Sequence, residues 1–240
     1  MYIYGRNPVK EAYIAGKTVD KIFVQKGEFD PMLSRVLKLA KEARTVVSYV
    51  DKNMLDKLAN GGNHQGIVAA VTDFSYCDIE DIINLANEKG EPLLIVILDG
   101  ITDPHNLGAI IRSAECFGAH GIVIPKHRSV TVNDTVVKVA CGATEHMLIA
   151  KVTNINDTIR WLKEQNVWVY ATDFDGKVPK DANLNGNLAI VIGSEGEGIH
   201  RLTKDLCDDT LTIPQYGKVN SLNASVAAGI VLYEAIRQRR

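Results

Sequence analysis

Three short polar segments in the last two thirds of the chain hold the residue types that chemistry needs. Asn106 to Arg112 places an amide and a guanidinium on one predicted helix, and Gly193 to Gly198 (GSEGEG) sets two carboxylates among three glycines. Ser221 to Ser225 (SLNAS) opens an apolar helix behind Ile213-Pro214. Each segment follows the end of a predicted strand. Since ligands of open parallel sheets bind beyond the carboxyl ends of the strands, we expect the three segments to converge on one ligand.

The residue types favour particular ligands, although each segment also has a simpler structural explanation. An arginine at position 112 could bind a phosphate bidentately, whereas Asn106 could instead cap its helix with Arg112 in solvent. The carboxylates of Glu195 and Glu197 disfavour phosphate and suit a ligand with hydroxyls and a positive centre, but the loop could also be a plain strand-to-helix turn. Ser221 or Asn223 could be a helix cap. The spacing alone leaves both interpretations open.

Composition points to an ordinary globular protein. The chain has 240 residues, 46% of them hydrophobic, and a net charge of −2, which fits one large domain or two small ones. Residues 1–75 carry 11 Lys/Arg against 8 Asp/Glu, and the remainder carries 16 against 21. A polyanion would therefore be expected to contact the N-terminal part.

Several classes of protein are disfavoured. The four cysteines include no CxxC pair, so a disulfide framework or zinc site is not expected, and a reducing cytoplasm fits. We predict that Cys116 and Cys141 lie in the core. The six histidines lack a metal-ligand spacing such as HExxH, so no metal is expected, and His64 and His200 are interpreted as structural or surface residues. There is no signal-peptide pattern, and the longest aliphatic run, 93–98, cannot span a membrane. The missing GxGxxG disfavours a nicotinamide dehydrogenase.

Hydrophobic periodicity predicts two α/β regions. Residues 1–72 alternate helices with strands and form a small domain; the helices are 7–15, 31–43 and 51–59, and the strands 21–25, 46–50 and 67–71. Residues 73–91 are interpreted as a linker with a helical piece. In residues 92–240, uninterrupted aliphatic strands predict a parallel sheet covered by helices on both faces. Its strands are 93–98, 121–124, 168–172, 188–192 and 211–213, and its helices are 106–118, 133–142, 155–165, 198–206 and 221–237.

Taken together, the three segments resemble the SpoU/TrmH family of the knotted SPOUT methyltransferases. The matching motifs are NLGAIIRSA (106–114), IVIGSEGEG (190–198) and LTIP (211–214) through SLNASVA (221–227), in the family's order and spacing. Residues 5–9 (GRNPV) and 63–69 (NHQGIVA) resemble the family's auxiliary domain, which is similar to ribosomal proteins of the L30e/L7Ae type and recognises RNA. The resemblance is greatest to the TrmH group 3 subgroup (RlmB type), which methylates a guanosine 2′-hydroxyl in 23S rRNA.

The resemblance implies a fold, a cofactor and an assembly. The fold would be an α/β trefoil knot that binds S-adenosylmethionine (SAM), and the protein would be a cytoplasmic homodimer joined through the knot domain, so that Arg112 could act across the interface. The implied catalytic residues are Asn106, Arg112, Glu195, Ser221 and Asn223. The implied cofactor-binding residues are Thr172, Gly193, Ser194, Gly196, Ile213, Pro214, Leu222 and Ser225.

Other functions remain open within this resemblance. The substrate could instead be a tRNA guanosine, and a protein with an inactive knot could be a non-catalytic RNA-binding assembly factor. The presence of Arg112, Glu195 and Asn223 argues against the inactive form.

Overall fold

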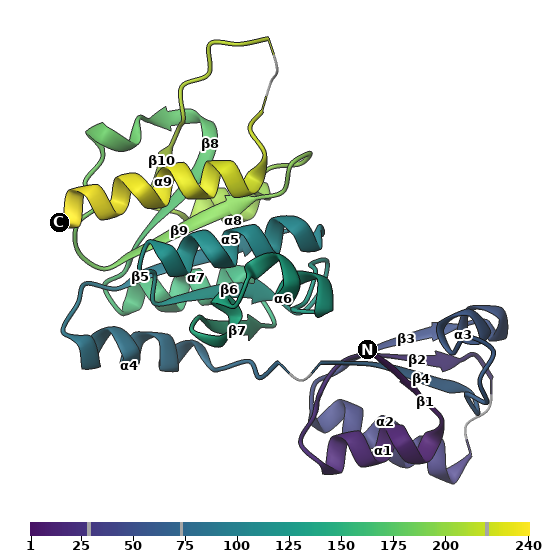
Figure 1. Ribbon diagram of the computed structural model, residues 1–240. Helices are drawn as coiled ribbons and strands as arrows, with labels where there is room; N and C mark the ends of the chain where they lie inside the picture. The colour runs from purple at the N-terminus through teal and green to yellow at the C-terminus, as the bar shows by residue number, and fades with distance from the viewer. Residues whose placement is uncertain (28–29, 73, 219–220) are drawn as a thin grey trace. The chain divides into compact units, whose positions relative to one another are not determined.

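The computed structural model describes residues 1–27, 30–72, 74–218 and 221–240. The chain forms two compact units, Met1–Ser75 and Tyr76–Arg240 (Figure 1).

The first unit is a four-stranded sheet with helices packed on it. Its strands run in the order β1-β4-β2-β3, with β2 and β3 parallel and the other pairs antiparallel. The strands are β1 (Tyr2–Tyr4), β2 (Thr18–Gln25), β3 (Val46–Val50) and β4 (Ile67–Thr72), and the helices are α1 (Arg6–Ile14), α2 (Pro31–Glu42) and α3 (Lys52–Leu58). The main core joins apolar residues of α1 and α2 to β2 and β4, including Val9, Val36, Ile22 and Ile67. The three predicted helices and three of the strands are confirmed, whereas the three-residue strand β1 is too short to leave a periodic pattern.

A fixed loop precedes β4. His64 is buried, and its Nδ1 atom accepts a hydrogen bond from the backbone N–H of Gly66 at 3.0 Å while Nε2 lies 3.0 Å from Asp56 Oδ1. The backbone carbonyl of Gln65 accepts a hydrogen bond from Arg6 Nε at 3.0 Å. These contacts confirm the structural interpretation of His64 and hold the loop against the start of α1.

The second unit is a six-stranded parallel sheet in the order β10-β8-β9-β5-β6-β7. The strands are β5 (Leu94–Asp99), β6 (Gly121–Pro125), β7 (Leu148–Val152), β8 (Trp168–Lys177), β9 (Leu188–Gly193) and β10 (Asp209–Leu211). The central strands β5 and β9 are almost wholly buried, which explains their uninterrupted aliphatic sequences. The predicted parallel sheet is confirmed. Strand β7, at the edge, was not predicted, because Lys151 interrupts its short apolar run.

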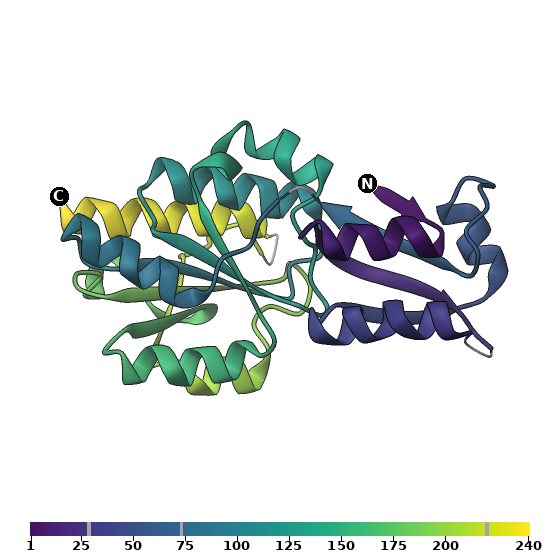
Figure 2. The same ribbon diagram turned by 90° about the horizontal axis from the view of Figure 1, so that it is seen from below.

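Helices cover both faces of this sheet. They are α4 (Ile79–Lys89), α5 (Pro104–Cys116), α6 (Asp134–Ala140), α7 (Ile155–Glu164), α8 (Arg201–Leu206) and α9 (Ala224–Arg239). Figure 2 shows α5 and α9 along one face and α7 and α8 along the other. Helix α4 shares a hydrophobic core with α7 and the strands between them. Within the described residues, no helix is long and apolar enough to cross a membrane.

The predicted linker at 73–91 is wrong in its extent. Residues 76–91 belong to the second unit, where α4 packs with Ile82 and Ala86 fully buried. The acidic residues that suggested a linker lie on the outer side of this helix and at its start, where the Asp81 carboxylate accepts a hydrogen bond from the backbone N–H of Asp78 at 3.0 Å. The polar composition therefore reflects an amphipathic helix and its cap. The predicted knot involves residues 219–220, which lie outside the described part of the chain, and it stays a prediction.

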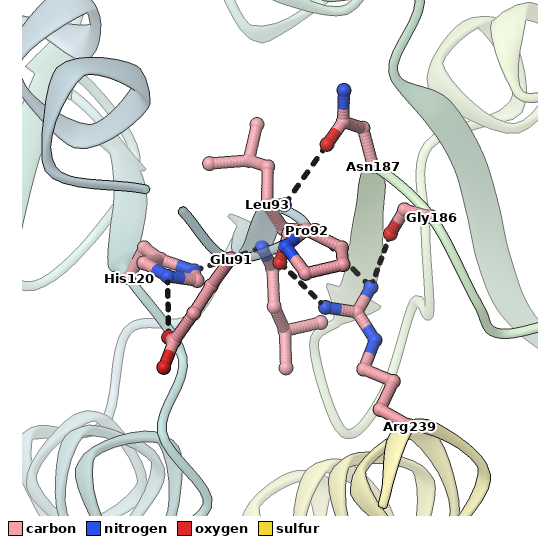
Figure 3. A network of polar contacts seen from close by, with 8 residues as sticks. Glu91, Pro92, Leu93, His120, Gly186, Asn187 and Arg239 are labelled. Carbon is pink, nitrogen blue, oxygen red and sulfur yellow. Dashed lines mark hydrogen bonds and ion pairs between the residues drawn. The ribbon is translucent and has the colours of Figure 1, made fainter. Parts of the chain in front are cut away.

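The last helix is anchored at its C-terminal end by Arg239 (Figure 3). The guanidinium donates hydrogen bonds of 2.6 to 3.1 Å to four backbone carbonyl oxygens, those of Pro92, Leu93, Leu184 and Gly186. Partial burial lowers the pKa of Arg239. Beside it, the side chain of Asn187 accepts a hydrogen bond from the N–H of Leu93 at 2.9 Å, and buried His120 accepts one from the N–H of Leu94 at 3.1 Å. The end of α9 is thus tied to the segment that enters β5.

Candidate active site

Asn106, Glu195 and Asn223 form one hydrogen-bonded network, although they are 28 to 117 residues apart in sequence. Asn106 Nδ2 donates to Glu195 Oε1 at 3.0 Å, and Asn223 Nδ2 donates to Asn106 Oδ1 at 2.8 Å. Asn223 Nδ2 also contacts Glu195 Oε1. The predicted convergence of the three polar segments is therefore confirmed for these three side chains.

Asn106 reaches the network from the first turn of α5. The helix begins at Pro104, and the Asp103 side chain caps it by accepting a hydrogen bond from the N–H of His105 at 3.1 Å. The alternative role of Asn106 as the cap is therefore wrong. The apolar residues that follow it pack into the core, so Asn106 is itself only 6% exposed. A buried amide requires hydrogen-bond partners, and Glu195 and Asn223 provide them.

The segment Gly193–Gly198 forms a closed loop that presents Glu195. The N–H of Ser194 donates to the carbonyl of Gly198, and the N–H of Gly198 donates back to Ser194, both at 3.0 Å. A Cβ atom on Gly193 would lie 2.2 Å from the carbonyl carbon of Gly198. Glycine is required at position 193 because the loop closes onto its own backbone, whereas Gly198 has a φ of +68°.

Asn223 has two roles, which resolves the ambiguity in the sequence. Its Oδ1 atom caps α9 by accepting hydrogen bonds from the N–H groups of Ser225 and Val226 at 3.0 and 3.2 Å. The Ser225 hydroxyl donates to the same oxygen at 2.6 Å. The Nδ2 group remains for Asn106 and Glu195. Both explanations of this segment, a helix cap and a polar site residue, therefore hold for one side chain.

A cavity of about 360 Å³ lies beside this network, at the carboxyl ends of β8 and β9. Six of the eight predicted cofactor-binding residues line it, namely Thr172, Gly193, Ser194, Gly196, Ile213 and Leu222, together with Glu195 and Ser221. Pro214 and Ser225 are not among the lining residues of the described chain. The Thr172 hydroxyl donates to the carbonyl of Val191 at 2.8 Å, which ties β8 to β9 just after their last backbone pair.

The cavity combines apolar walls with negative charge. Ile192, Leu211 and Phe174 supply apolar surface, and Asp173, Glu195 and Glu197 supply carboxylates, with no Lys or Arg among the described lining residues. Partial burial tends to raise the pKa of Asp173, but hydrogen bonds from Lys204 and from the backbone N–H of Phe174 outweigh it and lower this pKa. This chemistry fits a cationic ligand that has a flat apolar part, and it disfavours a phosphate.

Arg112 lies apart from this network. It is exposed, and its Nη1 atom donates to the Sγ atom of Cys141 at 3.5 Å. Between described residues, no hydrogen bond joins Arg112 to Asn106, Glu195 or Asn223. The structure therefore brings together three of the five predicted catalytic side chains by direct contact, and Ser221 by its place in the cavity wall.

Some residues of the site were missed or misplaced from the sequence. Phe174, within β8, and Gln215, after β10, line the cavity but belong to no motif of their own. Cys141, predicted to be in the core, is exposed and has a φ of +51° at the end of α6. Cys116 is also exposed, because it lies off the apolar stripe of α5. Among the described residues, no group of three potential metal ligands gathers.

The fold and the site define a class of protein: a parallel α/β protein whose cavity suits a cationic ligand with an apolar part, beside a polar network at the strand ends. Comparison with known families agrees. Residues 93–233 match the SpoU rRNA methylase family, and residues 2–77 match the domain described as RNA 2′-O ribose methyltransferase substrate binding. The chain belongs to the SpoU/TrmH family of SAM-dependent RNA methyltransferases.

Relatives along the whole chain support this assignment. The chain is 44% identical over 238 residues to a Staphylococcus haemolyticus protein named as a TrmH family tRNA/rRNA methyltransferase, covering 99% of this chain and 95% of the relative. It is 42% identical over 240 residues to YacO of Bacillus subtilis, similarly named, covering 99% and 96%.

Solved structures with bound cofactor are also similar. The SpoU methyltransferase AviRb from Streptomyces viridochromogenes, in complex with AdoMet (SAM), has a TM-score of 0.63 and 26% identity, covering 100% of this chain and 90% of that one. An AdoMet-bound rRNA methyltransferase from Sinorhizobium meliloti has a TM-score of 0.60 and 26% identity, covering 98% and 86%. SAM is therefore the cofactor of this family's fold, in agreement with the charge of the cavity.

Proposed function

We propose that this protein methylates the 2′-hydroxyl of a guanosine in 23S ribosomal RNA. The observation that carries the proposal is the Asn106–Glu195–Asn223 network at the edge of a cavity lined with carboxylates. When bound, SAM would supply a methyl group on a sulfonium, and transfer of this methyl would release a neutral thioether, a good leaving group. The remaining task for the protein is to position and activate a weakly acidic hydroxyl.

The residues divide this task. Thr172, Gly193, Ser194, Gly196, Ile213 and Leu222 would hold the cofactor from the cavity wall, with Pro214 and Ser225 supporting the loop on either side. Asn106, Glu195, Ser221 and Asn223 would order the acceptor ribose and the methionine end of the cofactor. Preorganised amides and carboxylates suit this because they need not reorganise during the reaction.

Arg112 would bind the phosphate next to the acceptor ribose and stabilise the developing alkoxide. An arginine stays protonated at working pH, so a role as general base is disfavoured. Its exposed position, held by Cys141, leaves the guanidinium fork available to an external ligand. The phosphate itself or a water molecule would accept the proton.

The active enzyme would be a homodimer joined through the second unit. Val226, Ile230 and Tyr233 are all at least 40% exposed and recur at helical spacing along α9. The Tyr233 ring packs edge to face with Phe117, which follows the last residue of α5, at 6.1 Å between centroids. An exposed apolar stripe along α9 supports a self-complementary interface.

The first unit would recognise the RNA. Its matched domain type and its positive balance of 11 basic against 8 acidic residues support contact with a polyanion. The recognition domain would be the first unit, Met1–Ser75, and the methyltransferase domain the second, Tyr76–Arg240, which extends the predicted 92–240 by α4. Deleting the first unit should leave SAM binding intact and abolish modification of long rRNA. Full activity of the shortened chain would contradict this division.

The decisive experiment incubates the protein with labelled SAM and either unmodified 23S rRNA or tRNA, and then maps the 2′-O-methyl site. A single methylated guanosine in rRNA is expected, whereas a tRNA product would make the protein a tRNA guanosine methyltransferase. Arg112→Lys should lower turnover at saturating RNA about a hundredfold, because it keeps the charge but loses the fork. The control is Arg160→Lys, on an exposed arginine of α7. Calorimetry with SAM would identify a non-catalytic RNA-binding factor by the absence of binding.

A further inference from the structure

A second cavity, of about 300 Å³, lies at the carboxyl ends of β5, β6 and β7. Its polar lining includes Asp99, His127, Arg128, Asn154, Asn156 and His200. We propose that this cavity binds a backbone phosphate of the RNA strand that carries the acceptor ribose. The inference rests on the proposed function, since it names a second contact for the same substrate.

His200 is held in a fixed orientation on one wall of the cavity. Buried Asp99 accepts hydrogen bonds from the backbone N–H of His200 at 2.9 Å and from its Nδ1 atom at 2.8 Å. Nε2 is then the ring nitrogen left for a ligand, and an imidazolium can donate from both nitrogens. Each oxygen of the Asp99 carboxylate accepts a hydrogen bond from His200, and the residue is only 6% exposed, so His200 and not Asp99 presents its polar atoms to a ligand.

Arg128 lies on the rim in a conformation that its own sequence does not favour. Its φ is +56°, in the left-handed region that non-glycine residues rarely occupy. The loop that holds it is tied down on both sides of Arg128. The N–H of Lys126 donates to Val152 O at 2.8 Å, the Ser129 hydroxyl to Ile101 O at 3.0 Å, and the N–H of Val130 to Ile101 O at 2.8 Å. An unfavourable backbone held by such anchors is a reason to look for a function.

The side chains of this rim suit an anion. His127 and Arg128 are exposed, and neither forms a hydrogen bond or ion pair with another described residue. Arginine without an acidic partner at a cavity mouth is well suited to bind phosphate through two parallel hydrogen bonds. The protein thus has two neighbouring cavities of different character: the first has carboxylates and no described cation, and the second has Arg128 and two histidines beside a buried carboxylate.

The position of the cavity connects it to the methyl-transfer site. His200 follows the loop that presents Glu195, and Asp99–Gly100 lead into the start of α5, which carries Asn106. A Cβ built on Gly100 would lie 3.7 Å from the Cβ of Ser194 and 3.5 Å from Cε1 of His200. Since a ribose within an RNA strand has a phosphodiester on each side, an anion site that borders the same segments is placed to receive the strand.

The test is Arg128→Ala in the full-length protein, with an in vitro transcript of 23S rRNA as the probe. The dissociation constant for RNA should rise about tenfold, and the slope of log affinity against log salt should decrease in magnitude by about 0.7 to 1, as expected for one lost phosphate contact. SAM affinity and turnover at saturating RNA should not change. The matched control is Arg160→Ala, whose arginine pairs with Asp157 at 2.7 Å on the outer part of α7.

A second variant separates function from folding. Arg128→Gly removes the unfavourable left-handed side chain, so it should raise the melting temperature by about 2 °C while weakening RNA binding as much as the alanine variant does. Unchanged RNA affinity and salt slope in both variants would overturn the inference. A titration with inorganic phosphate at constant ionic strength gives a second check. If the variants lose phosphate binding but keep their affinity for RNA, the cavity is a site for a free anion and the inference fails. Failure of the proposed function would differ, because the wild-type protein would itself not methylate RNA.

Discussion

Replacing Asn223 by alanine should destabilise the second unit by about 2 to 4 kcal/mol. Loss of the cap of α9, where Oδ1 accepts the N–H groups of Ser225 and Val226, accounts for about 1 kcal/mol. The variant also lacks Asn223 Nδ2, which donates to Oδ1 of buried Asn106. That oxygen is then left without this partner, which costs about 1 to 3 kcal/mol. Because Asn223 is itself exposed, water can reach the vacated position, and the lower half of the range is favoured.

The matched control is Asn133→Ala. Asn133 caps α6 in the same way, by accepting the N–H groups of Thr135 and Val136 at 3.0 and 3.1 Å, and its side chain has no part in the network. Thermal unfolding followed by circular dichroism should show a larger loss for Asn223→Ala than for the control. The excess over the cap is about 1 to 3 kcal/mol, so at about 2 to 4 °C per kcal/mol it should be roughly 2 to 12 °C. That difference in melting temperature reports the hydrogen bonds of Asn223 to Asn106 and Glu195, because both variants lose a helix cap.

An aspartate at position 223 tests the same network through pH. Asn223→Asp keeps the cap, since aspartate and asparagine cap helices about equally well, but it sets a second carboxylate against Glu195. Repulsion raises the pKa of the pair in the folded protein above its unfolded value of about 4. A carboxyl group with a raised pKa in the folded protein binds its proton more tightly there than in the unfolded chain. The repulsion is therefore relieved by protonation at low pH, and the variant should approach wild-type stability near pH 4. It should lose stability relative to the wild type as pH rises from about 4 through the raised folded value.

Two results would refute this reasoning. Equal losses for Asn223→Ala and Asn133→Ala would mean that the hydrogen bonds to Asn106 and Glu195 contribute nothing beyond the cap. A pH-independent difference between Asn223→Asp and the wild type, over pH 4 to 8, would mean that residue 223 does not face Glu195. Either result would also remove the main support for the proposed site.

Three further outcomes follow from the structure. Gly193→Ala should prevent the loop from closing and abolish SAM binding in calorimetry, because its Cβ would lie 2.2 Å from the backbone of Gly198; retained affinity would show that the loop can open. Arg239→Lys should lower the melting temperature by several degrees, since one ammonium cannot replace hydrogen bonds to four carbonyls, and an unchanged melting curve would contradict the anchor. Burial, with the nearby Asp208 carboxylate, raises the pKa of Cys207 to about 12. At pH 8 a thiol reagent should therefore label exposed Cys141 well before Cys207 in the folded protein, and equal labelling rates would refute the burial argument.

The sequence predicts the sheet of the second unit better than the details of its site. Continuous aliphatic runs identify buried parallel strands because both faces must be covered, and the strand-end rule then places the polar segments together. Hydrogen-bond partners are harder to predict. Asp103 caps α5 because it directly precedes Pro104, the first residue of the helix, whereas the sequence alone also allowed Asn106, which is closer to the apolar stripe, as the cap. Phe174 and Gln215 were missed because a cavity wall is set by tertiary packing and not by spacing. The helical piece predicted in the linker is confirmed as α4, but the many acidic residues suggested a solvated segment, although Ile82 on the inner face of the helix is buried.

The direction of Arg112 explains why we expect a site shared between two subunits. Successive residues of an α-helix turn by about 100°, so Arg112, six residues after Asn106, points about 120° away from it. One copy of α5 therefore cannot aim both side chains at the same ribose, whereas a symmetric dimer could supply Arg112 from the partner. Mixing the inactive variants Arg112→Ala and Asn223→Ala should then restore about a quarter of wild-type activity, because half of the dimers are mixed and each has one intact site. If the mixture stays inactive although mass spectrometry detects mixed dimers, Arg112 must act within its own subunit.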